Sequence, residues 1–339
     1  MYKIGVLYLL LLLLERHILP SWTHPLDRIP PSIYSSLSLL STPTTSFSET
    51  AHEREEWKDI QPIPQNDGSE PLCPIAYSKE LAQKREHSKR ALDLTSHIIT
   101  LVPAHYTIWN YRLEIIDHIK ANLEEELAWV EEMAIGNPKC YQVWHHRQAI
   151  LSRMPNPKVT QEFKVLSVAL EEDAKNYHAW TYRQWLLRTY GGWEGELEFI
   201  EQLLKDDPYN NSAWNQRYLV IHHDPSLVTL DTLKQEVSYT MDRIRLAPDN
   251  ESAWNYLSGT VRHDLLRLGP LVEEFVLSVK EKGWSHCVSM NVHIVELYEM
   301  DPTDETRRQR ALQSLDILIK NDAIRIKYWT WIKEHMESN

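Results

Sequence analysis

Two lysines stand where a side chain could take part in chemistry. Lys139 and Lys175 each lie five residues before a tryptophan, in Pro-Lys-Cys-Tyr and Ala-Lys-Asn-Tyr respectively. A lysine in the turn before a helix adds to the positive end of the helix dipole, at a small cost. The same position, close to free backbone N–H groups, could seat an anionic group such as a phosphate. The alternative is an ordinary solvated lysine.

Two histidine pairs suggest metal binding at first sight. His145-His146 and His222-His223 are both pairs of adjacent residues. Neighbouring residues on a helix point about 100° apart, so a pair cannot chelate one ion well. No histidine follows either pair at the fourth position with a carboxylate to complete a zinc site. The sequence therefore predicts no metal site in this chain.

The composition excludes several functional classes. The chain has nine glycines in 339 residues, and no Gly-Lys-Ser/Thr follows the cluster Gly191, Gly192 and Gly195. P-loop and Rossmann sites need such glycines, so both are excluded. The net charge of −12 is unfavourable for duplex nucleic acid. The three cysteines form no Cys-x-x-Cys pair, which fits a reducing compartment rather than a disulfide framework.

The N-terminal region has a character of its own. Lys3 precedes an apolar run from Ile4 to Leu14, which has the form of a signal peptide and is too short to span a bilayer comfortably. Residues 35–48 are mostly Ser and Thr. Residues 1–54 are thus interpreted as a disordered leader. Its start is a signal or anchor, a buried amphipathic segment, or sequence outside the mature protein.

The elements that position the lysines follow from an internal repeat. Five tryptophans are spaced 35, 36, 34 and 40 residues apart, namely Trp109, Trp144, Trp180, Trp214 and Trp254. Proline or alanine stands six residues before each of them. An arginine follows three residues after the first four, namely Arg112, Arg147, Arg183 and Arg217. A period near 35 is typical of a two-helix unit that stacks into a solenoid.

The repeat predicts an all-α fold, an α/α superhelix (a right-handed solenoid) of helical hairpins. Each tryptophan should enter the first turn of a helix, and the unit's second helix should carry apolar residues at helical spacing, as in residues 197–204. Beyond Trp254 the repeat decays. Residues 284–300 are a candidate degenerate copy, and Trp329 is a candidate marker of a last, weak copy of the repeat.

Structural roles account for most of the repeated residues. The tryptophan column is expected to anchor neighbouring hairpins in the core. Each arginine is expected to bridge to an acid or a carbonyl of the next hairpin. Asn210 and Asn250 begin glycosylation sequons, yet both stand where a helix cap belongs. Glycans there would collide with packing between repeats, which argues against export.

Four of the repeat motifs resemble a known family. Residues 141–147, 176–180, 210–217 and 250–257, for example Asn-Tyr-His-Ala-Trp at 176–180, closely resemble the α subunit of protein farnesyltransferase and type I geranylgeranyltransferase. The segment 56–68, from Glu-Trp-Lys-Asp-Ile to Asn-Asp-Gly, is similar to the same CaaX-type α subunit. The resemblance covers about residues 55–335. It divides the chain into a leader (1–54), a family-specific segment (55–76) and the repeats (77–339).

The resemblance implies a heterodimeric enzyme. The hairpins would wrap around a β subunit that binds zinc and most of the isoprenoid, and magnesium is also expected in the holoenzyme. The reaction would transfer farnesyl, or geranylgeranyl with another β subunit, from its diphosphate to the cysteine of a C-terminal CaaX sequence, as in small GTPases. A positioned cation would stabilise the leaving diphosphate. The acidic net charge predicts no nucleic-acid partner, and the isolated cysteines agree with a cytoplasmic location.

The family pattern assigns roles to residues of the turns. Lys139 would approach the diphosphate, Tyr141 would line the active site, and Gln142 would lie near the C-terminal carboxylate of the peptide. Further substrate-binding candidates in neighbouring repeats are Tyr106, Asn176, Tyr177 and His178. Cys140 replaces an expected asparagine. Between Tyr77 and Ala91 the chain is shorter than the pattern, which suggests an incomplete first hairpin.

Two other functions compete with this one. A helical-repeat scaffold could bind peptides and catalyse nothing, as repeat arrays commonly do. A Rab geranylgeranyltransferase α subunit would share the repeats, although the segment 56–68 points away from it. Dependence on a Rab escort protein would favour the Rab enzyme.

Overall fold

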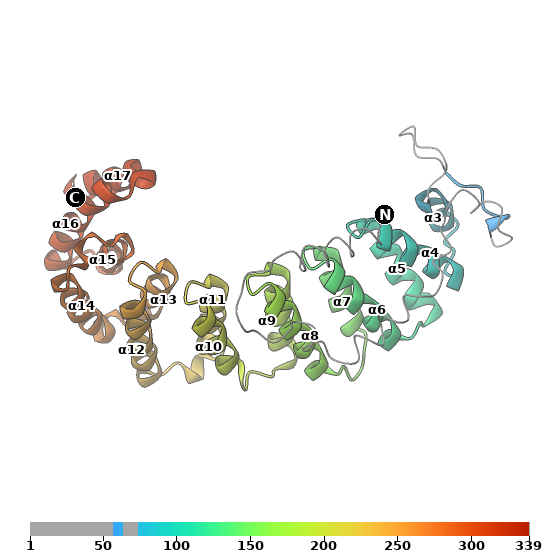
Figure 1. Cartoon of the computed structure of the whole chain (residues 1–339), viewed down its shortest axis with the longest axis horizontal. Helices are drawn as coiled ribbons and strands as arrows, with labels where there is room; N and C mark the ends of the chain where they lie inside the picture. Colours follow the sequence, from blue (N-terminus) through green and yellow to red (C-terminus); the bar gives the residue numbers. More distant parts are fainter. Residues whose placement is uncertain (1–56, 64–73, 339) are drawn as a thin grey trace, which may run out of the picture. The chain divides into compact units, whose positions relative to one another are not determined.

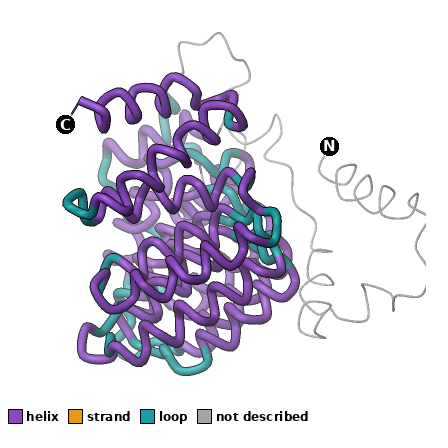
Figure 2. Tube along the Cα trace, turned by 90° about the vertical axis from the view of Figure 1, so that its left-hand side faces the viewer, coloured by secondary structure: helices purple, strands orange, loops and turns teal. Residues whose placement is uncertain are grey.

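The computed structural model describes residues 57–63 and 74–338. The predicted leader and Cys73 lie outside these residues. In the described part every regular element is helical (Figure 2), so the predicted all-α fold is confirmed. The chain divides into two compact units, residues 1–80 and 81–339.

The first unit contains the family-specific segment. Trp57 and Ile60 are buried, and the ring of Trp57 meets that of Tyr77 edge-on at 5.8 Å. The backbone N–H of Ile63 donates to the carbonyl of Ala76 at 3.1 Å. This carbonyl lies in α3 (Pro74–Gln83), which has proline at its first position, where no N–H is needed. Residues 57–63 thus pack against α3.

The second unit is a row of helical hairpins (Figure 1). The first five hairpins are α4 (Lys89–Leu101) with α5 (Tyr106–Ile119), α6 (Leu123–Gly136) with α7 (Tyr141–Leu151), α8 (Val159–Glu172) with α9 (Tyr177–Tyr190), α10 (Glu196–Asp206) with α11 (Asn211–His222), and α12 (Leu230–Leu246) with α13 (Glu251–Val261). The array continues through α14 (Leu265–Glu281), α15 (Val288–Met300), α16 (Glu305–Asn321) and α17 (Ile326–Ser338). Short 3₁₀ turns η4 (Pro225–Leu227), η5 (Trp284–His286) and η6 (Ala323–Arg325) lie in the connections.

The order of helices within a repeat differs from the prediction. Each tryptophan lies on the second helix of its hairpin, and residues 197–204 lie on α10, the first helix of the next one. The prediction placed the tryptophan helix first and was wrong on this point. A period fixes the repeat length but not the position at which a repeat begins. The α4–α5 hairpin is also complete, so the expectation of an incomplete first hairpin is wrong for this pair of helices.

All five tryptophans are buried and bonded alike. Each indole Nε1 donates, at 2.7–3.0 Å, to the carbonyl six residues earlier, namely that of Pro103, Pro138, Ala174, Pro208 or Pro248. Aromatic rings also pack across hairpins. The ring centroids of Trp214 and Tyr256 are 5.2 Å apart, and those of Trp254 and His293 are 5.3 Å apart. The predicted anchoring role of the column is confirmed.

The same turn carbonyls accept a second donor from the next hairpin. The Nδ2 of Asn176, Asn210 and Asn250 donates to Pro138, Ala174 and Pro208 respectively, at 3.1, 3.2 and 2.6 Å. The thiols of Cys140 and Cys287 occupy the equivalent places at the two ends, each 3.3 Å from its carbonyl oxygen. We call this series of shared carbonyls the turn ladder. Cys287 thus extends the turn ladder into residues 284–300, the candidate degenerate copy.

The asparagines of the turn ladder also cap their own helices. The Oδ1 of Asn210 accepts from the backbone N–H groups of Ser212 and Ala213, and that of Asn250 accepts from Ser252. Both asparagines are completely or almost completely buried. Capping therefore explains both sequons, since a buried amide in the folded chain has no room for a glycan.

The arginine column forms buried ion pairs between hairpins. Each arginine bonds a glutamate on the first helix of the next hairpin, as Arg112–Glu126, Arg147–Glu162, Arg183–Glu196 and Arg217–Glu236. Every glutamate also bonds one residue of the following helix, namely His146, Tyr182, Gln216 or Tyr256. The predicted structural role of these arginines is confirmed. The bond of each guanidinium to a carboxylate is what makes such buried charges tolerable.

Candidate functional site

The predicted site residues all lie at the turns that join the two helices of a hairpin. We call the surface formed by residues 103–106, 138–142 and 174–178 the turn edge. Tyr106, Tyr141 and Tyr177 are the first residues of α5, α7 and α9. Lys139 lies in the turn before α7, and Gln142 and His178 lie in the first turns of their helices. The turn ladder holds these turns side by side, so the predicted residues share one surface.

The three tyrosines of the turn edge are unusually exposed. Their exposed fractions are 65%, 56% and 74% for Tyr106, Tyr141 and Tyr177. Exposed aromatic side chains in a row are typical of surfaces that bind a partner or a ligand. The tyrosines of other columns behave differently: Tyr182 and Tyr256 are buried on glutamates. The turn edge therefore has the character of a binding surface.

The two turn lysines differ in how firmly they are paired. The ammonium of Lys175 lies 2.8 Å from Asp207 and, by hydrogen bonding, holds the pKa of that carboxyl below its usual value. The ammonium of Lys139 lies 3.9 Å from Asp173, and 83% of its side chain is exposed. A contact this long leaves the Lys139 charge available to an incoming anion. The residue pattern alone did not distinguish the two lysines, whereas the family resemblance singled out Lys139.

The aspartates were missed as candidate residues, although a signal existed. Asp173 and Asp207 each stand seven residues before a tryptophan and end the first helix of a hairpin. Each therefore faces the lysine of the preceding turn. Aligning the repeats would therefore have predicted that these two aspartates pair with the two lysines.

Asn176 differs from its neighbours on the turn edge. It is buried, its Oδ1 caps α9 through His178 and Ala179, and its Nδ2 donates to Pro138. Both the oxygen and the nitrogen of the Asn176 carboxamide are therefore already hydrogen-bonded. Its predicted contact with substrate stays a prediction, while Tyr177 and the partly exposed His178 are the accessible side chains of this turn.

Gln142 is fixed between two adjacent turns. Its Nε2 donates to the carbonyl of Ala104 in the preceding hairpin at 2.9 Å. Its Oε1 accepts from the thiol of Cys140 at 3.1 Å. The side chain therefore has a defined orientation before any ligand arrives, which favours binding because less entropy is lost.

The described residues contain no group of three or more His, Cys, Asp or Glu side chains that could hold a metal ion. His146, one of the histidines considered above, instead bonds Glu126 at 2.7 Å in the core. Among the described helices, none combines the length and apolar character required to cross a membrane.

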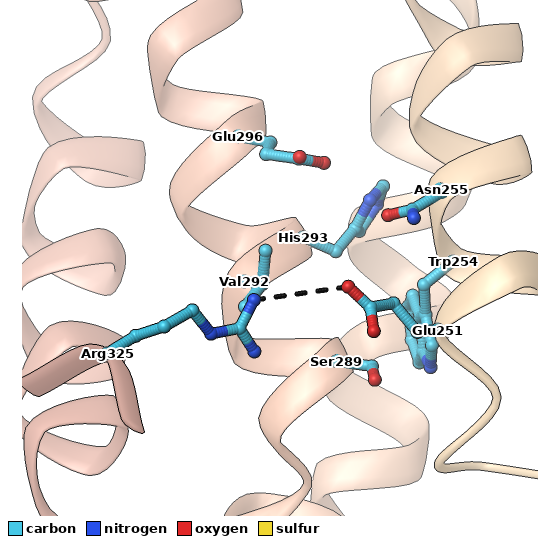
Figure 3. Close-up of a pocket in the computed structure, with 8 residues that line it drawn as sticks. All are labelled: Glu251, Trp254, Asn255, Ser289, Val292, His293, Glu296 and Arg325. Carbon is cyan, nitrogen blue, oxygen red and sulfur yellow. Dashed lines mark ion pairs between the residues drawn. The ribbon is translucent and has the colours of Figure 1, made fainter. Parts of the chain in front are cut away.

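A cavity of about 10 Å³ lies among α13, α15 and η6 (Figure 3). It has the size of one water molecule. Arg325 reaches toward Glu251 across it, and the completely buried His293 lies on its wall. The Nδ1 of His293 lies 2.5 Å from the hydroxyl of Ser258, and its Nε2 has no hydrogen-bond partner among the described residues. This site is suited to an uncharged imidazole rather than to ligand chemistry.

Because of His293, the free energy of unfolding is expected to decrease as the pH is lowered. Burial, with a smaller effect of the nearby Arg262, lowers its pKa to about 3. Below pH 6.5 the unfolded chain therefore takes up a proton that the folded chain does not, so the free energy of unfolding decreases as the pH falls. At pH 5 this loss is about 2 kcal/mol. Urea unfolding of wild type and His293→Gln at pH 7 and pH 5 should show a smaller loss for the variant.

The exposed His145 supplies the control for this experiment. His145→Gln makes the same substitution at an exposed position, so its stability at pH 7 should stay close to that of wild type. Equal pH dependence of wild type and His293→Gln would contradict the assignment.

Comparison with known proteins connects this architecture to one family. The family model described as "Protein prenyltransferase alpha subunit repeat" matches residues 88–119, 123–154, 159–190, 193–224 and 233–264. Each match coincides with one hairpin, from α4–α5 to α12–α13.

Whole-chain comparisons agree with the repeat matches. The chain is 35% identical to the protein farnesyltransferase/geranylgeranyltransferase type-1 subunit alpha of Pisum sativum, over 84% of this chain and 94% of that protein. It is similar to a chain of the solved Candida albicans protein geranylgeranyltransferase-I complexed with GGPP, with a TM-score of 0.70, 29% identity, and coverage of 82% and 98%. The geranylgeranyl transferase type-2 subunit alpha of Rattus norvegicus is 30% identical, but only over 54% of this chain and 36% of that protein.

Proposed function

The chain belongs to the protein prenyltransferase α-subunit family, and we propose that it acts as the α subunit of a heterodimeric CaaX prenyltransferase. The similarity to type-1 α subunits extends over most of both chains, whereas the similarity to the type-2 subunit covers about a third of that protein. The family is that of transferases of farnesyl and geranylgeranyl groups. The Rab-type alternative has no observation of its own in its favour.

The observation that best supports a catalytic rather than a scaffold role is the state of Lys139. It is the more exposed and more weakly paired of the two turn lysines, at the centre of a surface lined with exposed tyrosines. We propose that its ammonium contacts the diphosphate of the prenyl donor. As the bond to the prenyl carbon breaks, negative charge grows on the leaving group, and a cation already in place stabilises it.

The other residues of the turn edge would orient the substrates. Tyr141 and Tyr106 would line the cavity completed by the β subunit, and Tyr177 with His178 would form its rim in the next repeat. Gln142, held by Ala104 and Cys140, would donate to the C-terminal carboxylate of the CaaX peptide. The peptide's cysteine would receive the prenyl group and release its proton.

The metals and the location are part of the same proposal. The β subunit would hold zinc, which lowers the pKa of the peptide thiol, and magnesium would accompany the diphosphate. CaaX-bearing proteins such as small GTPases would be the substrates. A cytoplasmic location is supported by the burial of Asn210 and Asn250, whose sequons could not carry glycans in the folded chain.

Co-expression tests this function directly. The full chain, and a variant that begins at residue 55, would each be expressed with a tagged β subunit of farnesyltransferase or of type-1 geranylgeranyltransferase. We expect stable co-purification and transfer of a prenyl group to a fluorescent CaaX peptide, and no transfer by the α subunit alone. A complex without transfer would favour the scaffold function, and no complex with either β subunit would refute the proposal.

A further inference from the structure

We infer that Cys140 is a positioning residue for peptide recognition, because its thiol orients the carboxamide of Gln142 within the turn edge. The inference rests on the proposed function and adds a residue to it. It concerns the pair Cys140 and Gln142 together with the two carbonyls of the preceding turn, Pro103 and Ala104.

The first step is a contrast within the turn ladder. Asn176, at the position equivalent to Cys140, divides its side chain between capping α9 and bonding the carbonyl of Pro138. The Cys140 side chain makes no capping bond to α7. Its sulfur lies within reach of two acceptors, the carbonyl of Pro103 at 3.3 Å and the Oε1 of Gln142 at 3.1 Å. At this position, a bond to Gln142 therefore replaces the helix-capping bond that Asn176 makes.

The second step is the direction of the hydrogen bonds. The carbonyl of Ala104 can only accept, so the carboxamide must present its N–H to Ala104 and its oxygen to Cys140. The single thiol proton is shared between that oxygen and the carbonyl of Pro103. The amide nitrogen is then directed at the carbonyl of Ala104, 2.9 Å away. One of the two N–H bonds of this nitrogen is used there, and the other remains for a ligand. The reverse orientation would place the carboxamide oxygen against the carbonyl oxygen of Ala104 and would remove the acceptor that the thiol has in Gln142.

The consequence concerns binding rather than the chemical step. A carboxamide held at both ends loses little freedom when it donates to the carboxylate of a peptide. Without the thiol, the bond to Ala104 alone remains and the amide can turn. Binding of the peptide should weaken, while the diphosphate contact of Lys139 should not change.

The chain contains a matched control. Cys287 occupies the same position at the other end of the turn ladder, caps nothing, and donates to Pro248 at 3.3 Å. No glutamine follows it two residues later, where Ser289 stands. Loss of its thiol removes an equivalent structural bond without touching Gln142.

The experiment uses the full chain in complex with its β subunit, farnesyl diphosphate and a fluorescent CaaX peptide. Cys140→Ala should raise the KM for the peptide about three- to tenfold, with kcat and the KM for farnesyl diphosphate within about twofold of wild type. Cys140→Ser, which keeps a donor, should restore most of the peptide affinity. Cys287→Ala should leave all three constants unchanged.

A double variant separates positioning from general structure. Gln142→Ala should raise the peptide KM, and adding Cys140→Ala should then have no further effect, because the cysteine acts through the glutamine. An unchanged peptide KM in Cys140→Ala, or an undiminished effect in the Gln142→Ala background, would overturn the inference alone. Absence of transfer by the wild-type complex would overturn the proposed function and the inference with it.

Discussion

Lys139→Ala is expected to slow prenyl transfer by about 100-fold or more in the assembled heterodimer, the usual effect of losing one charge-stabilising group at a developing anion. The side chain is largely exposed and its contact with Asp173 is 3.9 Å long, so its removal should cost the fold little. Heterodimer formation should therefore be unaffected. Single-turnover kinetics with prenyl diphosphate bound in advance would measure the chemical step directly.

Lys175→Ala is the matched control for this prediction. It removes the same charge from the equivalent turn of the next hairpin, where the ammonium is already bonded to Asp207 at 2.8 Å. Its transfer rate should stay within about threefold of wild type, since its charge is largely offset by the aspartate. Equal losses in the two variants would indicate a general effect of surface charge, and an unchanged rate in Lys139→Ala would refute its role.

Arg147→Ala is expected to reduce the free energy of unfolding by about 3–5 kcal/mol, the usual effect of leaving a buried charge without its partner. Two nitrogens of Arg147 bond the Glu162 carboxylate at 2.6 and 2.8 Å, and both side chains are almost fully buried. After the substitution only Tyr182 would still donate to this carboxylate. Urea unfolding followed by tryptophan fluorescence would measure the change.

Arg153→Ala is the control for an exposed pair of similar geometry. Arg153 bonds Asp117 of the preceding hairpin at 2.7 and 2.8 Å, but both side chains are substantially exposed, so the loss should be about 1 kcal/mol or less. Removing both charges, as Arg147→Met with Glu162→Leu, should recover much of the lost stability. If Arg147→Ala were no worse than Arg153→Ala, burial would not be what makes the arginine column important.

Much of this architecture could be predicted because the repeat supplies its own alignment. A tryptophan with an arginine three residues later, repeated at a constant spacing, indicates which side chains must meet between hairpins. Arg112 and Trp109 illustrate this: both lie on one face of α5, and both are buried in the structure. The exposed turn positions followed from the same columns.

The remaining features depend on tertiary contacts that an alignment of the repeats does not reveal. The helix that pairs with the tryptophan helix is decided by packing, so the phase of the repeat was misplaced. The difference between Lys139 and Lys175 depends on how closely an aspartate of the next hairpin approaches. The burial of Asn176, a substrate-binding candidate, could not be predicted because its bond to Pro138 spans 38 positions of the sequence.

The turn ladder has a consequence for how this protein can vary in length. The distance from turn carbonyl to tryptophan is six residues in all five copies, while the distance between tryptophans ranges from 34 to 40. The extra residues of the longest copy lie in η4 and the 17-residue α12, away from the turn edge. A shared carbonyl tolerates no insertion, because one added residue would break the bonds of two hairpins at once. Natural variants should therefore acquire new segments at the connections between hairpins, and the turn edge would keep its register while those connections change.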